Sequence, residues 1–502
     1  MRRTSRLSKK PLQADWSKDI AEADMGEFRA ENDSMGVMQV PVWALWGAST
    51  QRAIENFAVS GRAVPLELIH AYGLLKAACA KANRTLGKLD EARANAIIDG
   101  AGEIARGELD RHFVIDVFQT GSGTSTNTNV NEVIANRASQ KAGLAIGSKT
   151  PLHPNDHVNL GQSSNDTFPA ALHIAAALAL STQLVPALQK LRQELTRLAR
   201  DTDGIVKIGR THYMDATPIR AGQVFSGYAA QAENAIARAN RAIDVLRELP
   251  IGGTAVGTGL NTHAEFGASV CEELTRATAV HFYEARNHFE AQAARDGVVE
   301  ASGSLKTIAV SLSKIANDIR VLGSGPRCGI FELSLPATQP GSSIMPGKVN
   351  PVMCESVIQV AARVIGNDSA ITYGGFGGVG SILELNVAMP LLADALLESI
   401  RLLGNVSVLF VDKLLAGLQV NRERCEALIE QSLMMVTSLA PALGYERAAR
   451  LAQQAFAEGR TIRELAREQC LLDDDTLDAL LDPRAMTEPG GGDDSTGDST
   501  GV

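Results

Sequence analysis

Residues 304–322 read SLKTIAVSLSKIANDIRVL, and the spacing of the apolar side chains in this stretch predicts one long α-helix. Leucine and isoleucine recur there in steps of three and four residues, which places them on a single face of a helix. Long helices with such a face usually pack against one another, so the stretch indicates a helical bundle. The apolar face consists of Leu305, Ile308, Leu312, Ile315, Ile319 and Leu322.

A second apolar face lies between residues 170 and 200 and repeats this spacing. It predicts another long helix, in which Pro186 should cause a bend or a local adjustment, because proline cannot donate a backbone hydrogen bond. The face consists of Leu184, Leu188, Leu191, Leu195 and Leu198. The same reasoning predicts helices over residues 221–248, 264–289, 354–365 and 390–415, and short amphipathic helices from residue 421 onward.

The composition agrees with a mainly helical protein that has a large core. Of the 502 residues, 45% are hydrophobic and only 4% are aromatic, a balance that favours helices over sheets. The net charge of −9 argues against nucleic acid as a partner. No segment reaches the roughly 18–20 apolar residues of a membrane span, so no membrane association is expected. The six cysteines lack CxxC spacing and are predicted to be buried thiols in a reducing compartment.

Breaks in the helical pattern divide the chain into domains. The basic start MRRTSRLSKK is not followed by an apolar region, so no secretory signal is expected and the protein is predicted to be cytoplasmic. The last residues, rich in Gly, Asp, Ser and Thr, have nothing to bury and are predicted to be disordered. The predicted divisions are a flexible arm over residues 1–30, a mainly helical domain over 31–165, a long-helix domain over 166–420, a small helical domain over 421–487 and a disordered tail over 488–502.

One polar run, residues 341–351, reads GSSIMPGKVNP and contains groups that suit a reaction on an anion. Its serine hydroxyls can hold or give protons, and its glycines leave backbone N–H groups accessible. Lys348 supplies a positive charge and Asn350 supplies an amide, so the run can grip a carboxylate and stabilise developing negative charge. Glu355 follows closely and either orients a histidine or is a plain carboxylate on a helix surface.

Two further polar runs precede predicted helices. Residues 120–131 read TGSGTSTNTNVN, ahead of a helix expected to begin near Glu132, and residues 161–169 read GQSSNDTFP at the start of a long helix. The free N–H groups at a helix start can bind an anion. The alternative is that these hydroxyl and amide side chains only cap the helices.

Two histidine-containing runs complete the polar set. Residues 153–159 read HPNDHVN; their histidines and aspartate could ligate a metal, but they surround a Pro-Asn turn without a further ligand cluster, so no metal site is predicted. Residues 207–218 read KIGRTHYMDATP and are predicted to form a polar loop. His212 in this loop is either a catalytic acid or a structural hydrogen-bonding group.

Together these runs resemble the fumarase/aspartase family, and within it the class II fumarases, from about residue 36 to residue 459. The matching runs include GASTQRAIENF, TGSGTSTN, HPNDHVN, GQSSNDTFP, IGGTAVGTGLNTH, KIANDIR and GSSIMPGKVNP. The resemblance implies a mainly α-helical, three-domain subunit whose central long helices form a twenty-helix core in a homotetramer. It also implies reversible trans addition of water to fumarate, giving L-malate, without a metal or another cofactor.

The resemblance implies roles for individual residues in active sites that three subunits share. Ser342 is the implied base, and His212, paired with Glu355, is the implied acid. Lys348 stabilises the charge of an aci-carboxylate intermediate. The implied substrate-binding residues are Ser122, Thr124, Ser163, Ser164, Asn165, Thr211, Lys348 and Asn350, and a second, non-catalytic dicarboxylate site is implied at His153, Asn155 and Asp156.

Two other functions remain to be weighed against this one. Aspartate ammonia-lyase is disfavoured because Ser163-Ser164-Asn165 stands where aspartases usually have Ser-Thr-Asn. A non-catalytic oligomeric homologue is disfavoured because the implied base, acid and anion-binding groups are all present. The chain departs from the usual family pattern outside these groups, at Thr128, at Tyr213 and Met214, at Ala388 and Met389, and at residues 440–444.

Overall fold

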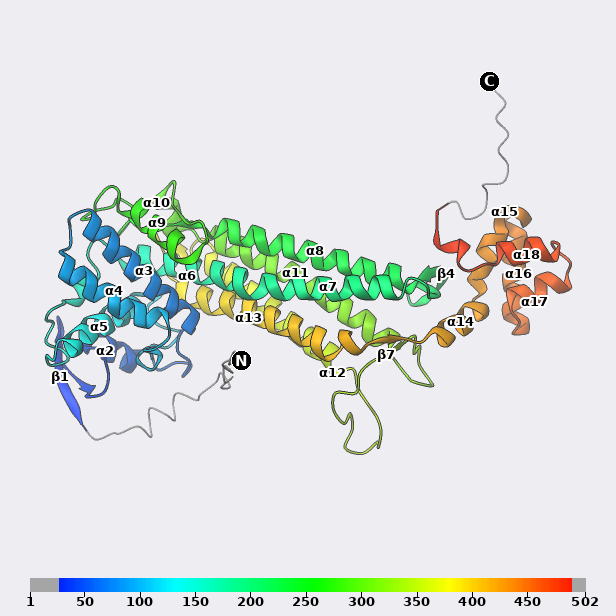
Figure 1. The fold of residues 1–502 in the computed structure, drawn as a ribbon, viewed down its shortest axis with the longest axis horizontal. Helices are drawn as coiled ribbons and strands as arrows, with labels where there is room; N and C mark the ends of the chain where they lie inside the picture. Colours follow the sequence, from blue (N-terminus) through cyan, green and yellow to red (C-terminus); the bar gives the residue numbers. More distant parts are fainter. Residues whose placement is uncertain (1–26, 490–502) are drawn as a thin grey trace, which may run out of the picture. The chain divides into compact units, whose positions relative to one another are not determined.

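The computed structural model describes residues 27–489, which form mainly α-helices (Figure 1). The chain divides into two compact units that are described separately below. Of the described residues, the first unit comprises residues 27–183, Ala239–Leu305 and Val364–Arg401, and the second comprises Leu184–Arg238, Lys306–Arg363 and residues 402–489. Most of the predicted arm (residues 1–26) and of the tail (490–502) lies outside the described residues, whereas residues 28–30 of the arm begin a strand.

The first unit is organised around helix α3 (Leu66–Thr85), which packs against α4 (Glu91–Ala105), α6 (Ser164–Ala179) and α9 (Phe266–Thr278). The inner face of α3 is fully buried and includes Leu68, Ile69 and Leu75. Other elements of this unit include the hairpin β1–β2 (Phe28–Asp33 and Gly36–Pro41), α2 (Ala48–Asn56), α5 (Thr124–Lys141), β5–β6 (Glu248–Leu249 and Tyr283–Glu284), α10 (His288–Ala293) and the hairpin β8–β9 (Ser381–Ile382 and Leu385–Asn386).

Helix α5 begins at Thr124, so the predicted start near Glu132 was wrong. Gly123 adopts a left-handed conformation (φ 72°) just before it, where a Cβ atom would lie 1.9 Å from the Phe168 ring. The first turns contain asparagines, which favour helices little by themselves. They are buried in the fold, and Asn129 donates to the carbonyl of His112 at 3.0 Å. Tertiary hydrogen bonds therefore override the weak local propensity.

The second unit contains α7 (Val185–Asp201) and parts of four long helices, α8, α11, α12 and α13 (Figure 1). Tyr228 of α8 donates to Asp318 of α11 at 3.0 Å, and Lys190 of α7 pairs with Asp412 of α13. Both predicted apolar faces are confirmed, since every member except Leu322 is buried. The long helices span Ala221–Val245, Asp296–Leu322, Val352–Gly375 and Met389–Lys413.

The adjustment predicted at Pro186 is present. A five-residue π-helix, Leu180–Leu184, separates α6 from α7, and Pro186 lies in the first turn of α7, where a missing N–H costs little. The helical segment Ser164–Asp201 is long and apolar enough to meet a membrane-span criterion, contrary to the sequence-based expectation. Because 67% of its apolar window is buried within the protein, we interpret it as a core helix.

The helix predicted over residues 264–289 is wrong in its second half. Helix α9 ends at Thr278, and Ala279 takes up a left-handed conformation (φ 60°) that stops it. The strand β6 (Tyr283–Glu284) follows, and α10 then starts beyond Asn287, whose side chain accepts hydrogen bonds from two backbone N–H groups. Local capping, which the apolar pattern does not reveal, ends one helix and begins the next.

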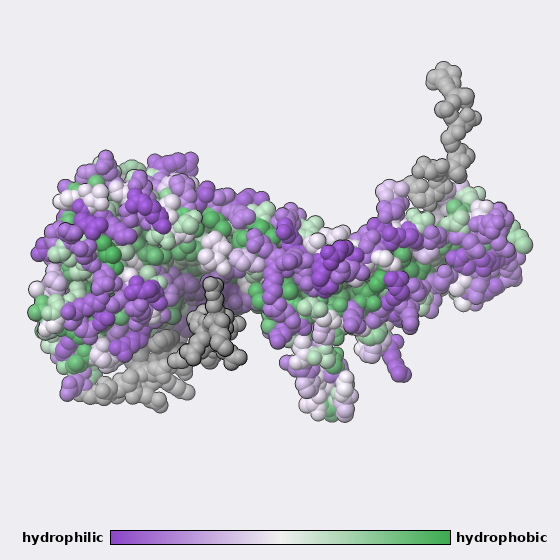
Figure 2. All heavy atoms as spheres, in the orientation of Figure 1, coloured by the Kyte–Doolittle hydropathy of each residue, from purple (hydrophilic) through white to green (hydrophobic). Residues whose placement is uncertain are grey.

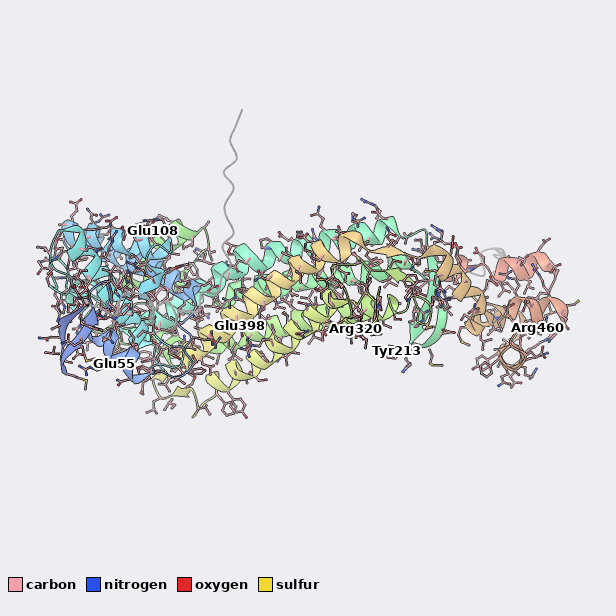
Figure 3. All side chains as sticks on the ribbon, turned by 90° about the horizontal axis from the view of Figure 1, so that it is seen from below. Glu55, Glu108, Tyr213, Arg320, Glu398 and Arg460 are labelled. Atoms are coloured by element: carbon pink, nitrogen blue, oxygen red, sulfur yellow. The ribbon has the colours of Figure 1, made fainter. Side chains whose placement is uncertain are left out.

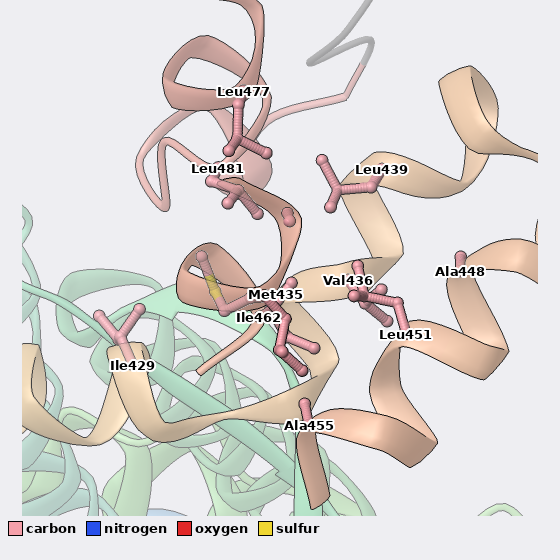
Figure 4. Packing of buried hydrophobic residues seen from close by; sticks show 12 residues of the cluster. Ile429, Met435, Val436, Leu439, Ala448, Leu451, Ala455, Ile462, Leu477 and Leu481 are labelled. Atoms are coloured by element: carbon pink, nitrogen blue, oxygen red, sulfur yellow. The ribbon is translucent and has the colours of Figure 1, made fainter. Parts of the chain in front are cut away.

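The short helices predicted after residue 421 are confirmed, and in the second unit they enclose a cluster of twelve buried apolar residues (Figure 4). Met435, Leu451 and Leu477 come from three of these helices. The elements are α14 (Arg422–Gln431), the 3-10 helix Leu433–Leu439, α15 (Ala440–Leu443), α16 (Tyr445–Glu458), α17 (Ile462–Glu468) and α18 (Asp474–Leu480). Four cysteines are buried as predicted, but Cys328 and Cys470 are exposed.

Candidate functional site

A hydroxyl cluster lies in the first unit, at the N termini of α5 and α6. Thr124 Oγ1 lies 2.9 Å from Ser122 Oγ and 2.7 Å from Ser164 Oγ, so three predicted binding residues are brought together. Thr124 is exposed, which leaves the cluster open to a ligand. Because two helix starts meet here, their free N–H groups and hydroxyls suit a carboxylate.

The start of α6 is closed by a capping box, in which Ser163 Oγ accepts from the Asn165 N–H at 3.2 Å and Asp166 Oδ1 accepts from the Ser163 N–H at 2.9 Å. Asn165 Nδ2 donates to the carbonyl of Ala255 at 2.8 Å. Side chains of this run therefore do cap α6. Capping does not exclude ligand binding, because the hydroxyl of Ser164 faces the cluster.

A buried polar network, which sequence reasoning missed, connects three of the polar runs behind the cluster. Lys76 Nζ donates to Asn159 Oδ1 at 3.1 Å and to Gln162 Oε1 at 2.8 Å. The same Asn159 oxygen accepts from Asn127 and Asn131. Burial lowers the pKa of Lys76 to about 8. The signal in the sequence was one lysine among the mainly apolar residues of the inner face of α3.

His153 caps a short π-helix, Pro154–Val158, by accepting from the N–H groups of Asn155 (3.3 Å) and Asp156 (3.1 Å). His153 and Asn155 line a cavity of about 400 Å³ in the first unit, together with Lys149 and Glu132. Asp156 is exposed and is not among the described residues that line this cavity. Two of the three residues predicted for a second site thus share one cavity.

Residues 207–218, predicted to be a polar loop, instead form most of a hairpin in the second unit. Strands β3 (Val206–Thr211) and β4 (Met214–Arg220) pair antiparallel, and His212 and Tyr213 form the turn. Both turn residues have positive φ angles (56° and 62°), which is the backbone of a type I′ turn. Both are exposed, and Figure 3 labels Tyr213. The turn therefore presents His212 and the neighbouring Thr211 to solvent.

Glu332 anchors the hairpin and was not found from the sequence. Its carboxylate is fully buried and accepts two hydrogen bonds from the Arg210 guanidinium, at 2.9 and 3.0 Å. Lys207 Nζ lies 3.1 Å from the same carboxylate, and burial lowers the pKa of this lysine. The buried Lys207 and the partly buried Arg210 thus share the Glu332 carboxylate, and Arg210 lies two residues before His212.

We expect Glu332→Gln to destabilise the protein by about 3–5 kcal/mol, the usual cost of removing one partner from a buried ion pair. The amide would leave the positive charges of Lys207 and Arg210 uncompensated. The midpoint of chemical denaturation measures the change. Glu423→Gln removes an exposed carboxylate of α14 and should change the midpoint little. Equal midpoints for the two variants would contradict the anchoring role.

The run 341–351 forms a closed loop in the second unit. The Gly341 N–H donates to the Lys348 carbonyl at 2.8 Å, and Asn350 Nδ2 donates to the Gly341 carbonyl at 2.6 Å. A Cβ atom on Gly341 would lie 2.4 Å from the Lys348 carbonyl oxygen, so no larger residue fits without a backbone shift. The closure brings Ser342 and Lys348 into one small loop.

Ser342 Oγ accepts hydrogen bonds from the backbone N–H groups of Ile344 (3.2 Å) and Met345 (2.9 Å). Two such donors stabilise negative charge on this oxygen, which favours loss of its proton. Ser343, by contrast, is exposed and Lys348 is also exposed. Glu355 is half-buried in the first turn of α12, and among the described residues no hydrogen bond or ion pair joins it to His212.

Apart from Glu355 on α12 and the residues at the His153 cavity, the predicted site residues therefore form three groups within one chain. The hydroxyl cluster and the capping residues of α6 belong to the first unit. The hairpin turn and the closed loop belong to the second unit. Each group presents hydrogen-bond donors or a cation, and a dicarboxylate is the kind of ligand that such groups recognise.

The chain is similar to known lyases over most of its length. Residues 36–366 match the family described as Lyase, and residues 435–488 match the family described as Fumarase C C-terminus. The chain is 54% identical to "Fumarate hydratase class II" of Mycobacterium tuberculosis, over 93% of this chain and 98% of the relative. It is 52% identical to the protein of the same name from Corynebacterium efficiens, over 92% of this chain and 96% of the relative.

Solved structures agree with these matches. The crystal structure of recombinant class II fumarase from Schistosoma mansoni superposes with a TM-score of 0.89 at 38% identity, and covers 92% of this chain and 100% of that chain. A fumarate lyase structure from Brucella melitensis gives a TM-score of 0.88 at 42% identity over 92% of this chain and all of that chain. The mainly helical fold with long helices is thus shared with these proteins.

Proposed function

This chain belongs to the fumarase/aspartase lyase family as a class II fumarate hydratase, and we propose that it catalyses the reversible trans addition of water to fumarate, giving L-malate in the tricarboxylic acid cycle. The observation that carries this conclusion is identity above 50% over more than nine-tenths of the chain. The hydroxyl cluster and the closed loop support it, because both suit a dicarboxylate.

In the direction of dehydration, Ser342 takes a proton from the carbon next to one carboxylate of malate. The electron pair moves onto that carboxylate and forms an aci-carboxylate, whose extra negative charge must be stabilised. The charge of Lys348 and the amide of Asn350 are suited to this task. The two N–H groups that donate to Ser342 Oγ support its role as the base.

The second step breaks the carbon–oxygen bond, and the departing hydroxyl needs a proton to leave as water. His212, at the exposed hairpin turn, is the proposed acid, with Glu355 stabilising its protonated form. The hydroxyl cluster, with Ser163, Asn165 and Thr211, is the proposed binding surface for the substrate carboxylates. Hydration of fumarate follows the same steps in reverse.

The hydroxyl cluster belongs to one unit of the chain, and the hairpin turn and the closed loop belong to the other. An oligomer can bring copies of these groups from different chains to one substrate. We propose the three-domain subunit and the homotetramer of this family, in which long helices form a twenty-helix core and three subunits share each active site. Hydrophobic residues at the surface of the long helices support this assembly (Figure 2). Val310 of α11 is 54% exposed and Tyr373 of α12 is 69% exposed.

The assembly predicts a particle of about 210 kDa, four times the 53.2 kDa chain. Light scattering coupled to size exclusion, at micromolar concentration, measures this mass. Activity should be lost when the tetramer is diluted until it dissociates, because no single chain holds a complete site. A fully active monomer would contradict the shared sites.

The activity itself is tested by following the absorbance of fumarate as it interconverts with L-malate, in the presence of a chelator. A parallel assay measures ammonia released from L-aspartate. We expect turnover of fumarate and malate with little or no ammonia release. Preferential turnover of aspartate would identify the protein as an ammonia-lyase, and no turnover in either assay would favour a non-catalytic homologue.

Two further proposals concern His153, Asn155 and Asp156, and the compartment of the cell in which the protein acts. The cavity lined by His153 and Asn155 is proposed to be a second, non-catalytic dicarboxylate site, with Asp156 at its edge. The protein is also proposed to act in the cytoplasm.

A further inference from the structure

Asp166 is a fully buried carboxylate that contacts two segments far apart in sequence. Its Oδ1 accepts from the Ser163 N–H at 2.9 Å, and its Oδ2 accepts from Gly252 at 3.2 Å and Thr254 at 3.0 Å. Among the described residues it forms no ion pair within 4 Å. One side chain therefore links the start of α6 to the loop of residues 252–255.

Helix capping alone does not require a charged side chain at position 166. Burial raises its pKa to about 6, so the carboxylate is ionised at neutral pH although ionisation in this place is unfavourable. The ionisable groups that interact with it are Tyr72, Lys76 and Cys79 on α3 and His288 on α10. A serine or asparagine caps a helix without this cost. Only a carboxylate can accept from all three N–H groups at once with both oxygens.

The loop that Asp166 holds is conformationally unusual. Thr254 has a positive φ angle (55°), which is rare for a β-branched residue and must be imposed by its surroundings. Asp166 binds its N–H, and Gln292 Nε2 donates to its carbonyl at 2.8 Å. Gln292 is fully buried. Asp166 thus holds the N–H of Thr254, and Gln292 holds its carbonyl.

This loop in turn fixes a predicted substrate-binding side chain. The carbonyl of Ala255, next to Thr254, accepts from Asn165 Nδ2 at 2.8 Å. If the loop moved, the amide of Asn165 would lose the partner that orients it. The chain of contacts runs from Asp166 through Thr254 and Ala255 back to Asn165.

We propose that Asp166 is a positioning residue of the active site: it holds the loop of residues 252–255 against the start of α6 and so orients Asn165 toward the substrate. The proposal rests on the proposed hydratase function. It assigns no contact with the substrate to Asp166 itself. The Gln292 side chain has the matching role on the other side of the loop.

The test compares full-length Asp166→Asn with the wild type under conditions where both are folded oligomers. The asparagine keeps the size of the side chain but presents an N–H group to at least one backbone donor. We expect the KM for fumarate to rise by roughly tenfold or more, by analogy with the loss of an outer-shell partner of a metal ligand. The kcat should fall much less, because Asn165 contacts substrate in both the ground state and the transition state.

Two further variants separate positioning from general stability. Gln292→Met removes the donor to Thr254 while keeping Asp166, and it should raise KM in the same way. Leu172→Ala opens a cavity at the buried face of α6, six residues beyond Asp166, and leaves the contacts of Asp166, Thr254 and Gln292 in place, so it should lower the melting temperature without raising KM. An unchanged KM in Asp166→Asn or Gln292→Met, or an equal rise in Leu172→Ala, would overturn the proposal.

Hydrogen exchange provides a readout that does not depend on the reaction. In the ligand-free protein, the amides of residues 252–256 should exchange faster in Asp166→Asn than in the wild type, whereas Leu172→Ala should leave their relative protection unchanged. Equal exchange in Asp166→Asn and the wild type would overturn the link between the carboxylate and the loop. If the wild-type protein were inactive and this exchange pattern were still observed, the hydratase function would be rejected, but the link between Asp166 and the loop of residues 252–255 would be retained.

Discussion

Ser342→Ala should lower kcat by roughly 10²–10⁴-fold, the range expected when a general base is removed, while the KM for malate changes little. The hydroxyl makes no charge contact with the ground-state substrate, so its loss acts mainly on proton transfer. Steady-state kinetics in both directions measure the effect. The two N–H groups of Ile344 and Met345 would remain but would have no oxygen to act on.

Ser343→Ala is the matched control for this prediction. Ser343 is the neighbouring hydroxyl in the same loop, and it is exposed. Among the described residues, its hydroxyl receives no hydrogen bond like those to Ser342. If Ser343→Ala were the more damaging change, Ser342 would not be the base, and the family membership would be unaffected.

Lys348→Ala should have an effect of a different kind. Lysine attracts the substrate carboxylate before the reaction and stabilises the larger charge of the aci-carboxylate during it. The kcat should therefore fall by roughly 10²–10³-fold, as when one donor to a developing negative charge is removed. The KM should rise as well, so kcat/KM falls further than kcat.

Lys413→Ala supplies the comparison, because it removes an exposed lysine of α13 in the same unit without touching the closed loop. Its kinetics should match those of the wild type. Lys348→Arg adds a second test: the charge remains, but the planar guanidinium has a different shape. An unaltered KM in Lys348→Ala would show that this lysine does not bind the substrate.

Several errors of the sequence analysis share one cause. The run 120–131 was expected to precede its helix, and residues 207–218 were expected to form a loop. Both contain residues with weak local preferences, so long-range contacts decide their structure. Asn129 is held by the carbonyl of His112, and Arg210 is held by Glu332, which lies 122 positions away in the chain. Arg210 and Glu332 lie too far apart for any local window of the sequence to contain both.

The sequence by itself determined the long helices and the candidate chemistry. The leucine and isoleucine faces could be read because a helix repeats every 3.6 residues, and burial of Leu312 and Leu191 follows from that period. The run GSSIMPGKVNP could be read because a reaction on an anion needs hydroxyls, an amide and a cation. Both are local properties of the chain.

Only the tertiary structure decided which groups support that chemistry. Lys76, Asp166 and Glu332 are charged residues in ordinary sequence surroundings, and they differ from surface residues only in being buried among partners from distant segments. Burial makes an uncompensated charge unfavourable, so each is held by specific hydrogen bonds, and each thereby fixes two or more segments relative to one another. The chemical groups are encoded locally, but their positions depend on contacts that exist only once the chain has folded.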